Sequence, residues 1–136
     1  TLLTIGSNDD INRNTSTYVA YVFSEVAGYS KIGRYYGNGN SDGVFVFTGF
    51  KVALLLVKRM TGSGNGWTII DNKRDIENPV TKQLYPHSVT TEASYDGVDF
   101  LANGFKMRQT NAWINGSTDY YYIAFAESPF KYARAR

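Results

Sequence analysis

The stretch Tyr-Tyr-Tyr-Ile-Ala-Phe-Ala at Tyr120–Ala126 decides the fold class. Aromatic, aliphatic and β-branched residues occupy both of its alternating faces, as in a strand that is covered on two sides. A similar stretch, Tyr-Val-Ala-Tyr-Val-Phe-Ser, lies at Tyr18–Ser24. Both segments predict β-strands, and we expect them to occupy comparable positions in sheets.

The two segments also form an internal repeat. Each begins with an aromatic strand and closes on Phe-x-Glu, at Glu25 in the first copy and at Glu127 in the second. Upstream of each strand, an Asn and an Ile-Asn pair recur in the same order, at Asn8, Ile11 and Asn12 and at Asn111, Ile114 and Asn115. We therefore expect residues 1–31 to be the terminal strands of a preceding repeat or donated strands, and residues 32–136 to form the β-sandwich module.

Between the repeats, short apolar runs alternate with Gly- and Asn-rich turns, a pattern typical of antiparallel strands. The longest predicted loop is Asn72–Tyr95, and loops longer than about 12–15 residues are usually functional or poorly ordered. Without a clear helical period in any segment of ten or more residues, we expect little helix. Strands are predicted at Val44–Phe47, Val52–Lys58, Trp67–Asp71, Val98–Leu101 and Phe105–Arg108.

Composition supports an all-β domain and excludes several chemistries. The 136 residues fit one domain, and 11 Tyr and 8 Phe favour strands. With no Cys and one His, thiol catalysis, disulfides and a His- or Cys-based metal site are excluded, and we expect neither a metal nor a cofactor. A net charge of +2 argues against nucleic-acid binding. The longest apolar runs fall well short of the ~20 residues that span a bilayer, so we expect no membrane insertion.

Two parts of the chain carry a family resemblance. The run Gly28–Gly43, continued by Phe45–Lys51, and the closing Ile123–Ala133 resemble a module of tailed-bacteriophage virion proteins. In that family the module sits at the C-terminal end of tail-fibre-like and other structural proteins. The resemblance implies a virion location, other virion subunits as partners and a homo-oligomer, with a trimer favoured. It brings no catalytic residues.

Aromatic residues in predicted loops are the candidate ligand-binding groups. Adjacent rings such as Tyr35 and Tyr36 point to opposite faces of a strand, so one of each pair must face outward. Flat rings stack on sugar C–H groups, while Asn, Asp and Arg side chains bond sugar hydroxyls. We expect a glycan-binding surface at one end of the sandwich, where a scaffold presents its loops. Its predicted residues are Tyr35, Tyr36, Arg74, Tyr85 and Trp113.

Other candidate sites have simpler interpretations. The Gly62–Gly66 turn lacks the Lys-Ser/Thr of a phosphate loop, and His87 is expected to be a solvated loop residue. Carboxylate pairs such as Asp71 with Asp75, or Asp96 with Asp99, could cleave sugars only if they faced each other about 5–9.5 Å apart in a deep cleft.

We therefore expect an all-β, antiparallel β-sandwich, lectin-like or jelly-roll-like. It would be a non-enzymatic phage virion module that acts in assembly and in recognition of a host-surface glycan. Two alternatives stay open, a capsid decoration or cement protein and, less favoured, a carbohydrate-active enzyme domain. The same loops could instead contact a neighbouring virion subunit.

Overall fold

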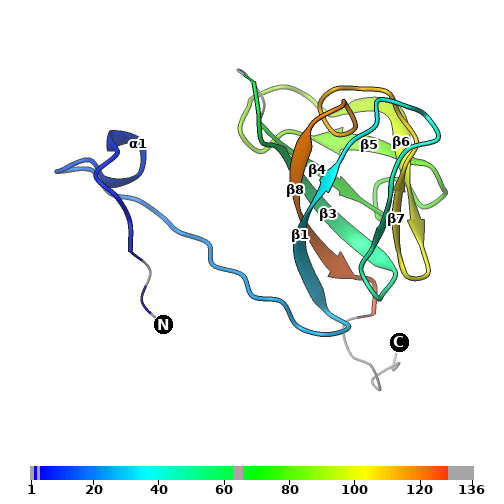
Figure 1. Ribbon diagram of the computed structural model, residues 1–136, viewed down its shortest axis with the longest axis horizontal. Coiled ribbons are helices and arrows are strands. Elements are labelled where there is room, and N and C mark those ends of the chain that lie inside the picture. Colours follow the sequence, from blue (N-terminus) through cyan, green and yellow to red (C-terminus); the bar gives the residue numbers. More distant parts are fainter. Residues whose placement is uncertain (1, 3, 63–65, 129–136) are drawn as a thin grey trace.

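The computed structural model describes residues 2, 4–62 and 66–128, and it confirms the all-β, antiparallel prediction with little helix (Figure 1). One four-residue helix, α1, precedes eight strands, and in the described part of the chain no helix is long and apolar enough to cross a membrane. The elements are α1 (Asp9–Asn12), β1 (Ser30–Tyr36), β2 (Phe45–Phe47), β3 (Val52–Arg59), β4 (Trp67–Asp71), β5 (Val80–Leu84), β6 (Ala93–Leu101), β7 (Gly104–Met107) and β8 (Asp119–Ala126).

The eight strands form a single sheet in the order β1-β8-β3-β4-β5-β6-β7-β2, with every neighbouring pair antiparallel. The sheet curls until its two edge strands approach each other, and the Lys31 ammonium lies 5.9 Å from the centre of the Phe47 ring. The result is a nearly closed barrel in which opposite halves of the sheet face each other across one core.

Side-chain alternation along the strands fills this core. On β8, Tyr120, Tyr122 and Ala124 are buried, whereas Tyr121 between them is half exposed. Burying apolar side chains on one face of each strand is the main stabilising contribution to such a sheet. The largest fully buried apolar side chains are Tyr120, Phe105, Leu55, Ile70, Met107, Ile114, Val52, Val57, Val80 and Val98.

The prediction for Tyr18–Ser24 is wrong, because this segment belongs to no sheet. It is extended but exposed, and it leads from α1 to the barrel along a path outside the barrel (Figure 1). A strand pattern favours extended backbone, but a strand also needs a partner, and this segment finds none in the described part of its own chain. The predicted equivalence with Tyr120–Ala126 therefore does not hold in the structure.

The prediction of one long loop over Asn72–Tyr95 is also wrong, because this region contains β5 and the beginning of β6. β5 reads Val-Thr-Lys-Gln-Leu, and a register shift near Val80 breaks its alternation. Only Val80 and Gln83 of β5 are buried, so its polar residues conceal the strand from a hydrophobic pattern.

Strand direction decides which connections share an end of the barrel. Because neighbouring strands alternate in direction, the connections that follow β1, β5 and β7 lie at one end, and those that follow β2, β4 and β6 lie at the other. We call the first of these the loop end and define it as residues 37–44, 85–92 and 108–118. It brings together three of the segments in which the sequence placed candidate ligand-binding residues.

Candidate ligand-binding site

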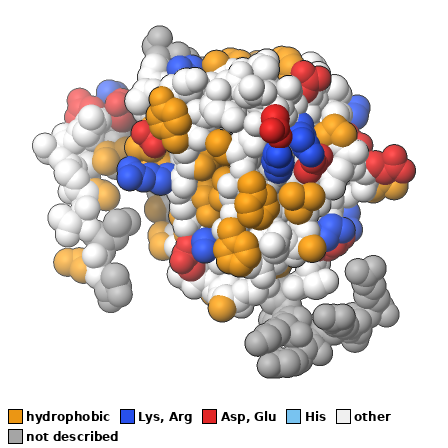
Figure 2. All heavy atoms as spheres, turned by 45° about the vertical axis from the view of Figure 1, so that its right-hand side comes forward, with side chains coloured by type: hydrophobic (Ala, Val, Ile, Leu, Met, Phe, Trp, Pro, Cys, Tyr) orange, Lys and Arg blue, Asp and Glu red, His pale blue; other side chains and the backbone are white. Residues whose placement is uncertain are grey.

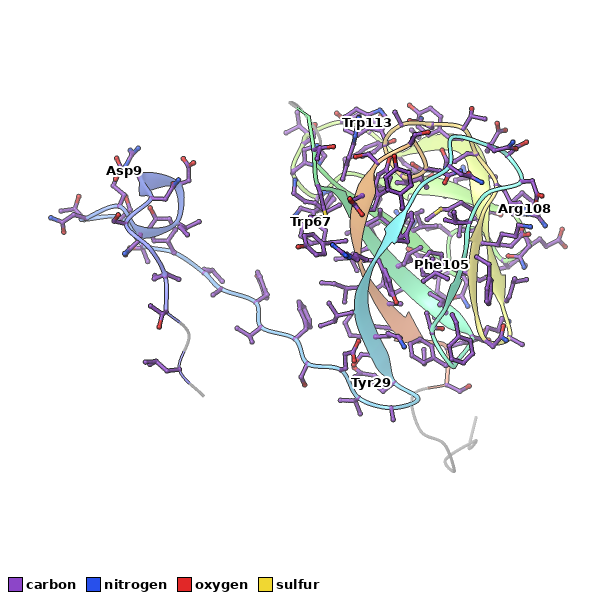
Figure 3. All side chains as sticks on the ribbon, viewed as in Figure 1. Asp9, Tyr29, Trp67, Phe105, Arg108 and Trp113 are labelled. Atoms are coloured by element: carbon purple, nitrogen blue, oxygen red, sulfur yellow. The ribbon has the colours of Figure 1, made fainter. Side chains whose placement is uncertain are left out.

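A hollow lined mainly by aromatic side chains opens at the loop end, with a volume of about 190 Å³. The ring of Tyr85 lies 6.1 Å from that of Trp113 and 6.2 Å from that of His87, between ring centres. Figure 3 shows Trp113 at the end of the barrel opposite Tyr29. We call this feature the aromatic hollow, and its lining residues are Tyr85, His87, Ser88, Thr90, Tyr95 and Trp113.

Local hydrogen bonds fix the turn that carries Trp113. The Trp113 N–H donates to Oδ1 of Asn111 at 2.9 Å, and the Asn115 N–H donates to the Asn111 carbonyl at 2.9 Å. Next to Trp113, the side chain of Ile114 is fully buried and anchors the turn in the core. The indole is thus held on a rigid turn while 37% of its surface stays exposed.

Asn115 joins two segments of the loop end. Its side chain is fully buried, and Nδ2 donates to the Gln109 carbonyl at 2.6 Å and to the Asn40 carbonyl at 2.8 Å. Its Oδ1 accepts the Asn38 N–H at 3.2 Å. One amide therefore bonds the β1–β2 connection to the β7–β8 connection, and a buried amide with this many partners is a strong local constraint.

Tyr120 supports the same turn from inside the barrel. Its hydroxyl donates to the Ala112 carbonyl at 2.6 Å and accepts the Gly116 N–H at 2.8 Å. Its ring stacks on that of Tyr35, with 5.1 Å between ring centres. Tyr120 thus connects the hydrophobic core to the turn at the loop end.

The aromatic hollow contains neutral hydroxyl groups. Burial raises the pKa of Tyr85 to about 12, and Tyr95 adds to the shift through its charge and a hydrogen bond. The Tyr85 hydroxyl is protonated near neutral pH, as tyrosines ordinarily are, and its oxygen can accept a hydrogen bond from a ligand while its O–H bonds Tyr95. Flat rings with neutral hydroxyl groups suit a neutral polar ligand better than a charged one.

A second hollow of about 320 Å³ lies beside the first, and Tyr95 lines both. Its other lining residues are Asp96, Gln109, Thr110 and Asn111. Gln109 is buried, and neither polar atom of its amide has a hydrogen-bond partner in the described part of the chain. The two hollows together form a continuous strip of aromatic and amide groups.

The structure brings together some of the predicted residues and separates others. Tyr85 and Trp113 share the aromatic hollow. Tyr36 lies at the loop end but outside the hollow, and its hydroxyl donates to the Ser117 carbonyl at 3.0 Å. As the sequence predicts, one ring of the Tyr35–Tyr36 pair faces outward, and it is Tyr36, which is 60% exposed.

Two predicted residues are corrected by their positions. Tyr35 points into the barrel, is 7% exposed and donates to the Ile114 carbonyl, so a surface ligand does not reach it. Arg74 lies in the β4–β5 connection and does not line the aromatic hollow, although its guanidinium reaches Glu92 at the edge of the loop end. Its guanidinium is bonded to Asp71 at 2.5 Å and lies 3.6 Å from Glu92, which makes it part of an ion-pair cluster.

Sequence reasoning missed Tyr95, Gln109 and Asn115 as parts of the site. The internal repeat includes Asn115, which matches Asn12, but it does not indicate that the Asn115 side chain is buried and bonds two connections. Tyr95 closes the predicted loop Asn72–Tyr95 and was not singled out there, whereas the structure places it in β6 and beside Tyr85 in the hollow.

Asp71 and Asp75, one of the carboxylate pairs considered for sugar cleavage, are held in structural bonds. Burial alone would raise the pKa of Asp71, but the N–H groups of Lys73 and Arg74 and the Arg74 guanidinium together lower it. Backbone and side-chain hydrogen bonds from Thr81 lower the pKa of Asp75. A general acid for glycoside hydrolysis needs a raised pKa, which is the opposite of both shifts. In the described residues there is also no group of three or more acidic, His or Cys side chains placed to hold a metal ion.

Comparison with known proteins gives one match. A family model described as Domain of unknown function (DUF7483) matches residues 1–129. No curated protein and no solved structure matches the chain.

Proposed function

The chain belongs to the family described as Domain of unknown function (DUF7483), and we propose that it is a non-enzymatic recognition module that binds a host-surface glycan at its loop end. The observation that carries the proposal is the aromatic hollow, where Tyr85, Tyr95 and Trp113 meet on a rigid framework. Aromatic faces cover the apolar C–H face of a sugar, while hydroxyl and amide groups bond its edge.

The size of the two hollows suggests how a glycan binds. Pockets for drug-sized ligands measure roughly 300–1,000 Å³, so a hollow of about 190 Å³ suits a single ring of a longer chain. A neighbouring ring would occupy the hollow of about 320 Å³ beyond Tyr95. There the side chains of Asp96, Thr110 and Asn111 offer donors and acceptors for sugar hydroxyls.

The biological setting of the proposal rests on the resemblance of Gly28–Gly43 and Ile123–Ala133 to tailed-phage virion modules. We place the domain on the virion surface, in a tail-fibre-like protein that associates with other virion subunits as a homo-oligomer, with a trimer favoured.

A second candidate function is that of a capsid decoration or cement protein, which acts only by contacting other subunits. It is favoured by the large apolar side chains exposed on Tyr18–Ser24 and on β2, because such surfaces mark protein interfaces. On that account the loop end contacts a neighbouring subunit and no sugar.

Substitution of the hollow's aromatic residues separates the two functions. In particles that carry Trp113→Ala or Tyr85→Ala, we expect adsorption to host cells to fall about tenfold or more, because a central aromatic contact contributes roughly 1.4 kcal/mol or more. The number of assembled particles should not change. Tyr121→Ala, which removes a half-exposed ring from the outer face of β8, is the matched control and should leave both unchanged. Failed assembly with Trp113→Ala would instead support the cement function.

A further inference from the structure

The arm, which we define as residues 16–25, is exposed although its sequence is that of a buried strand. Val19, Tyr21 and Val22 are 78%, 83% and 80% exposed. In the described part of the chain, no backbone hydrogen bond outside the named strands and helix involves residues 17–23. Its Phe23 ring contacts that of Phe125 on β8, with 5.7 Å between ring centres, but Val19, Tyr21 and Val22 and the backbone groups of residues 17–23 are left in contact with water.

The barrel has a complementary feature, the seam between its edge strands β1 and β2. The register of β1 with β8 and the bond from the Gly37 N–H to Thr118 show that odd-numbered residues of β1 bond to β8. The backbone groups of Ile32, Arg34 and Tyr36 therefore point to the seam.

The other side of the seam is formed by β2. Val46 lies at a position that bonds to β7, as the flanking bonds of Val44 and Thr48 show, so the backbone groups of Phe45 and Phe47 point to the seam. The rings of Phe45 and Phe47 are exposed on the outer surface. Figure 2 shows hydrophobic side chains gathered in the middle of this face, with charged side chains around them.

The arm does not fill the seam of its own chain, because side chains interrupt the hairpin that would place it there. Val26 and Ser30 form one antiparallel bridge. Beyond it, Oε1 of Glu25 accepts the Ile32 N–H at 3.0 Å, and the Ser30 hydroxyl donates to the Ser24 carbonyl at 2.9 Å. These two bonds occupy the Ile32 N–H and the Ser24 carbonyl, which the next pair of backbone hydrogen bonds would use, and the arm turns away from the barrel (Figure 1).

We propose that the arm of one copy adds as a strand to the β1 edge of a second copy, in the seam between β1 and β2. The seven residues Tyr18–Ser24 are long enough for the open part of this edge, which begins at the Ile32 carbonyl and continues through Arg34 and Tyr36, because Ser30 and the Ile32 N–H are already bonded to Val26 and Glu25. The arm also has the sequence pattern of β8, the strand that already pairs with the other edge of β1.

The seam matches the arm in a second way. A strand inserted there covers the core with one face and joins the exposed rings of Phe45 and Phe47 with the other, and the arm is apolar on both faces. Strand addition to an open edge gains main-chain hydrogen bonds as well as apolar burial. Each copy gives one arm and receives one, so exchange between two copies or around a closed ring of copies leaves no arm unpaired. This inference does not depend on glycan binding.

Single cysteines test the contact directly, because the chain contains none. Chains that carry Tyr21→Cys or Val22→Cys, one on each face of the arm, are mixed with full-length chains that carry Arg34→Cys on the β1 edge and a size tag. A disulfide needs Cα atoms about 4.4–6.8 Å apart. We expect at least one arm position to give a disulfide-linked pair of one tagged and one untagged chain under mild oxidation. Val89→Cys, which places an exposed thiol in the β5–β6 connection, should give at least tenfold less.

Two results would overturn the inference. One is the absence of mixed pairs while the double variant Val22→Cys/Arg34→Cys forms a disulfide within a single chain, which would mean that the arm closes on its own barrel. The other is a monomer mass for the unmodified chain by light scattering at micromolar concentration. If the inference holds, Val19→Asp together with Val22→Asp reduces an oligomeric mass to that of one chain, while sugar binding persists.

Discussion

Replacement of Asn115 by alanine is expected to lower the free energy of unfolding by about 1–3 kcal/mol. The side chain is fully buried, and its loss leaves the buried Gln109 carbonyl without this partner, while the Asn38 N–H and the Asn40 carbonyl belong to exposed residues and can bond water instead. Each buried polar group left unsatisfied costs roughly 1–3 kcal/mol. Because the same bonds hold the loop end together, sugar binding should weaken with stability.

Urea unfolding of the two proteins measures this difference. Asn103→Ala is the matched control, since Asn103 is an exposed asparagine in the β6–β7 turn, and we expect it to change stability by no more than about 0.5 kcal/mol. A loss below about 1 kcal/mol for Asn115→Ala would contradict its role as the bond between the two connections.

The second large effect is expected for Phe105→Ala, at about 3–5 kcal/mol. Phe105 is fully buried on β7, and its ring packs edge-on against those of Tyr122 and Tyr35, with 5.3 and 6.0 Å between ring centres. Figure 3 shows it within the barrel. Truncation of a buried Phe removes its transfer free energy and leaves a cavity that a rigid aromatic cluster fills poorly.

A loss of this size is a large share of the roughly 5–15 kcal/mol by which domains are stable. Tyr121→Ala, on the outer face of β8 and 49% exposed, is the control and should cost less than about 1 kcal/mol. Equal losses in thermal or urea unfolding for the two variants would contradict the inward orientation of β7.

The sequence predicts strands correctly where apolar runs are dense. It does not predict them correctly where pairing with a neighbouring strand determines whether a segment joins the sheet. β3 and β4 follow directly from Val52–Lys58 and Trp67–Asp71, and the all-β class follows with them. The sequence does not predict β1 and β5, because Gly33 interrupts one pattern and polar residues with a register shift conceal the other. For Tyr18–Ser24 the error is the opposite one. The sequence predicts a strand, but no neighbouring strand in the described part of the chain pairs with it.

The candidate site divides in the same way. Tyr85 and Trp113 come together because they lie in the β5–β6 and β7–β8 connections, and both connections are at the loop end. For Tyr35 and Tyr36 the sequence predicts that one ring faces outward, but only the register says which, because a shift of one residue exchanges the faces of a strand. Arg74 does not join Tyr85 in the hollow because β5, which was not predicted, lies between the two residues, and the Arg74 guanidinium pairs with Asp71 and Glu92 instead.

Binding of the chain to a panel of cell-surface glycans, followed by NMR titration with the best ligand, tests the central claim most directly. We predict shifts of the side-chain signals of Trp113, Tyr85 and Tyr95 on binding, and at least tenfold weaker binding by Trp113→Ala with an unchanged unfolding midpoint. The account is contradicted if no glycan binds, or if the signals that shift belong to residues away from the loop end while Trp113→Ala binds as well as the unmodified chain.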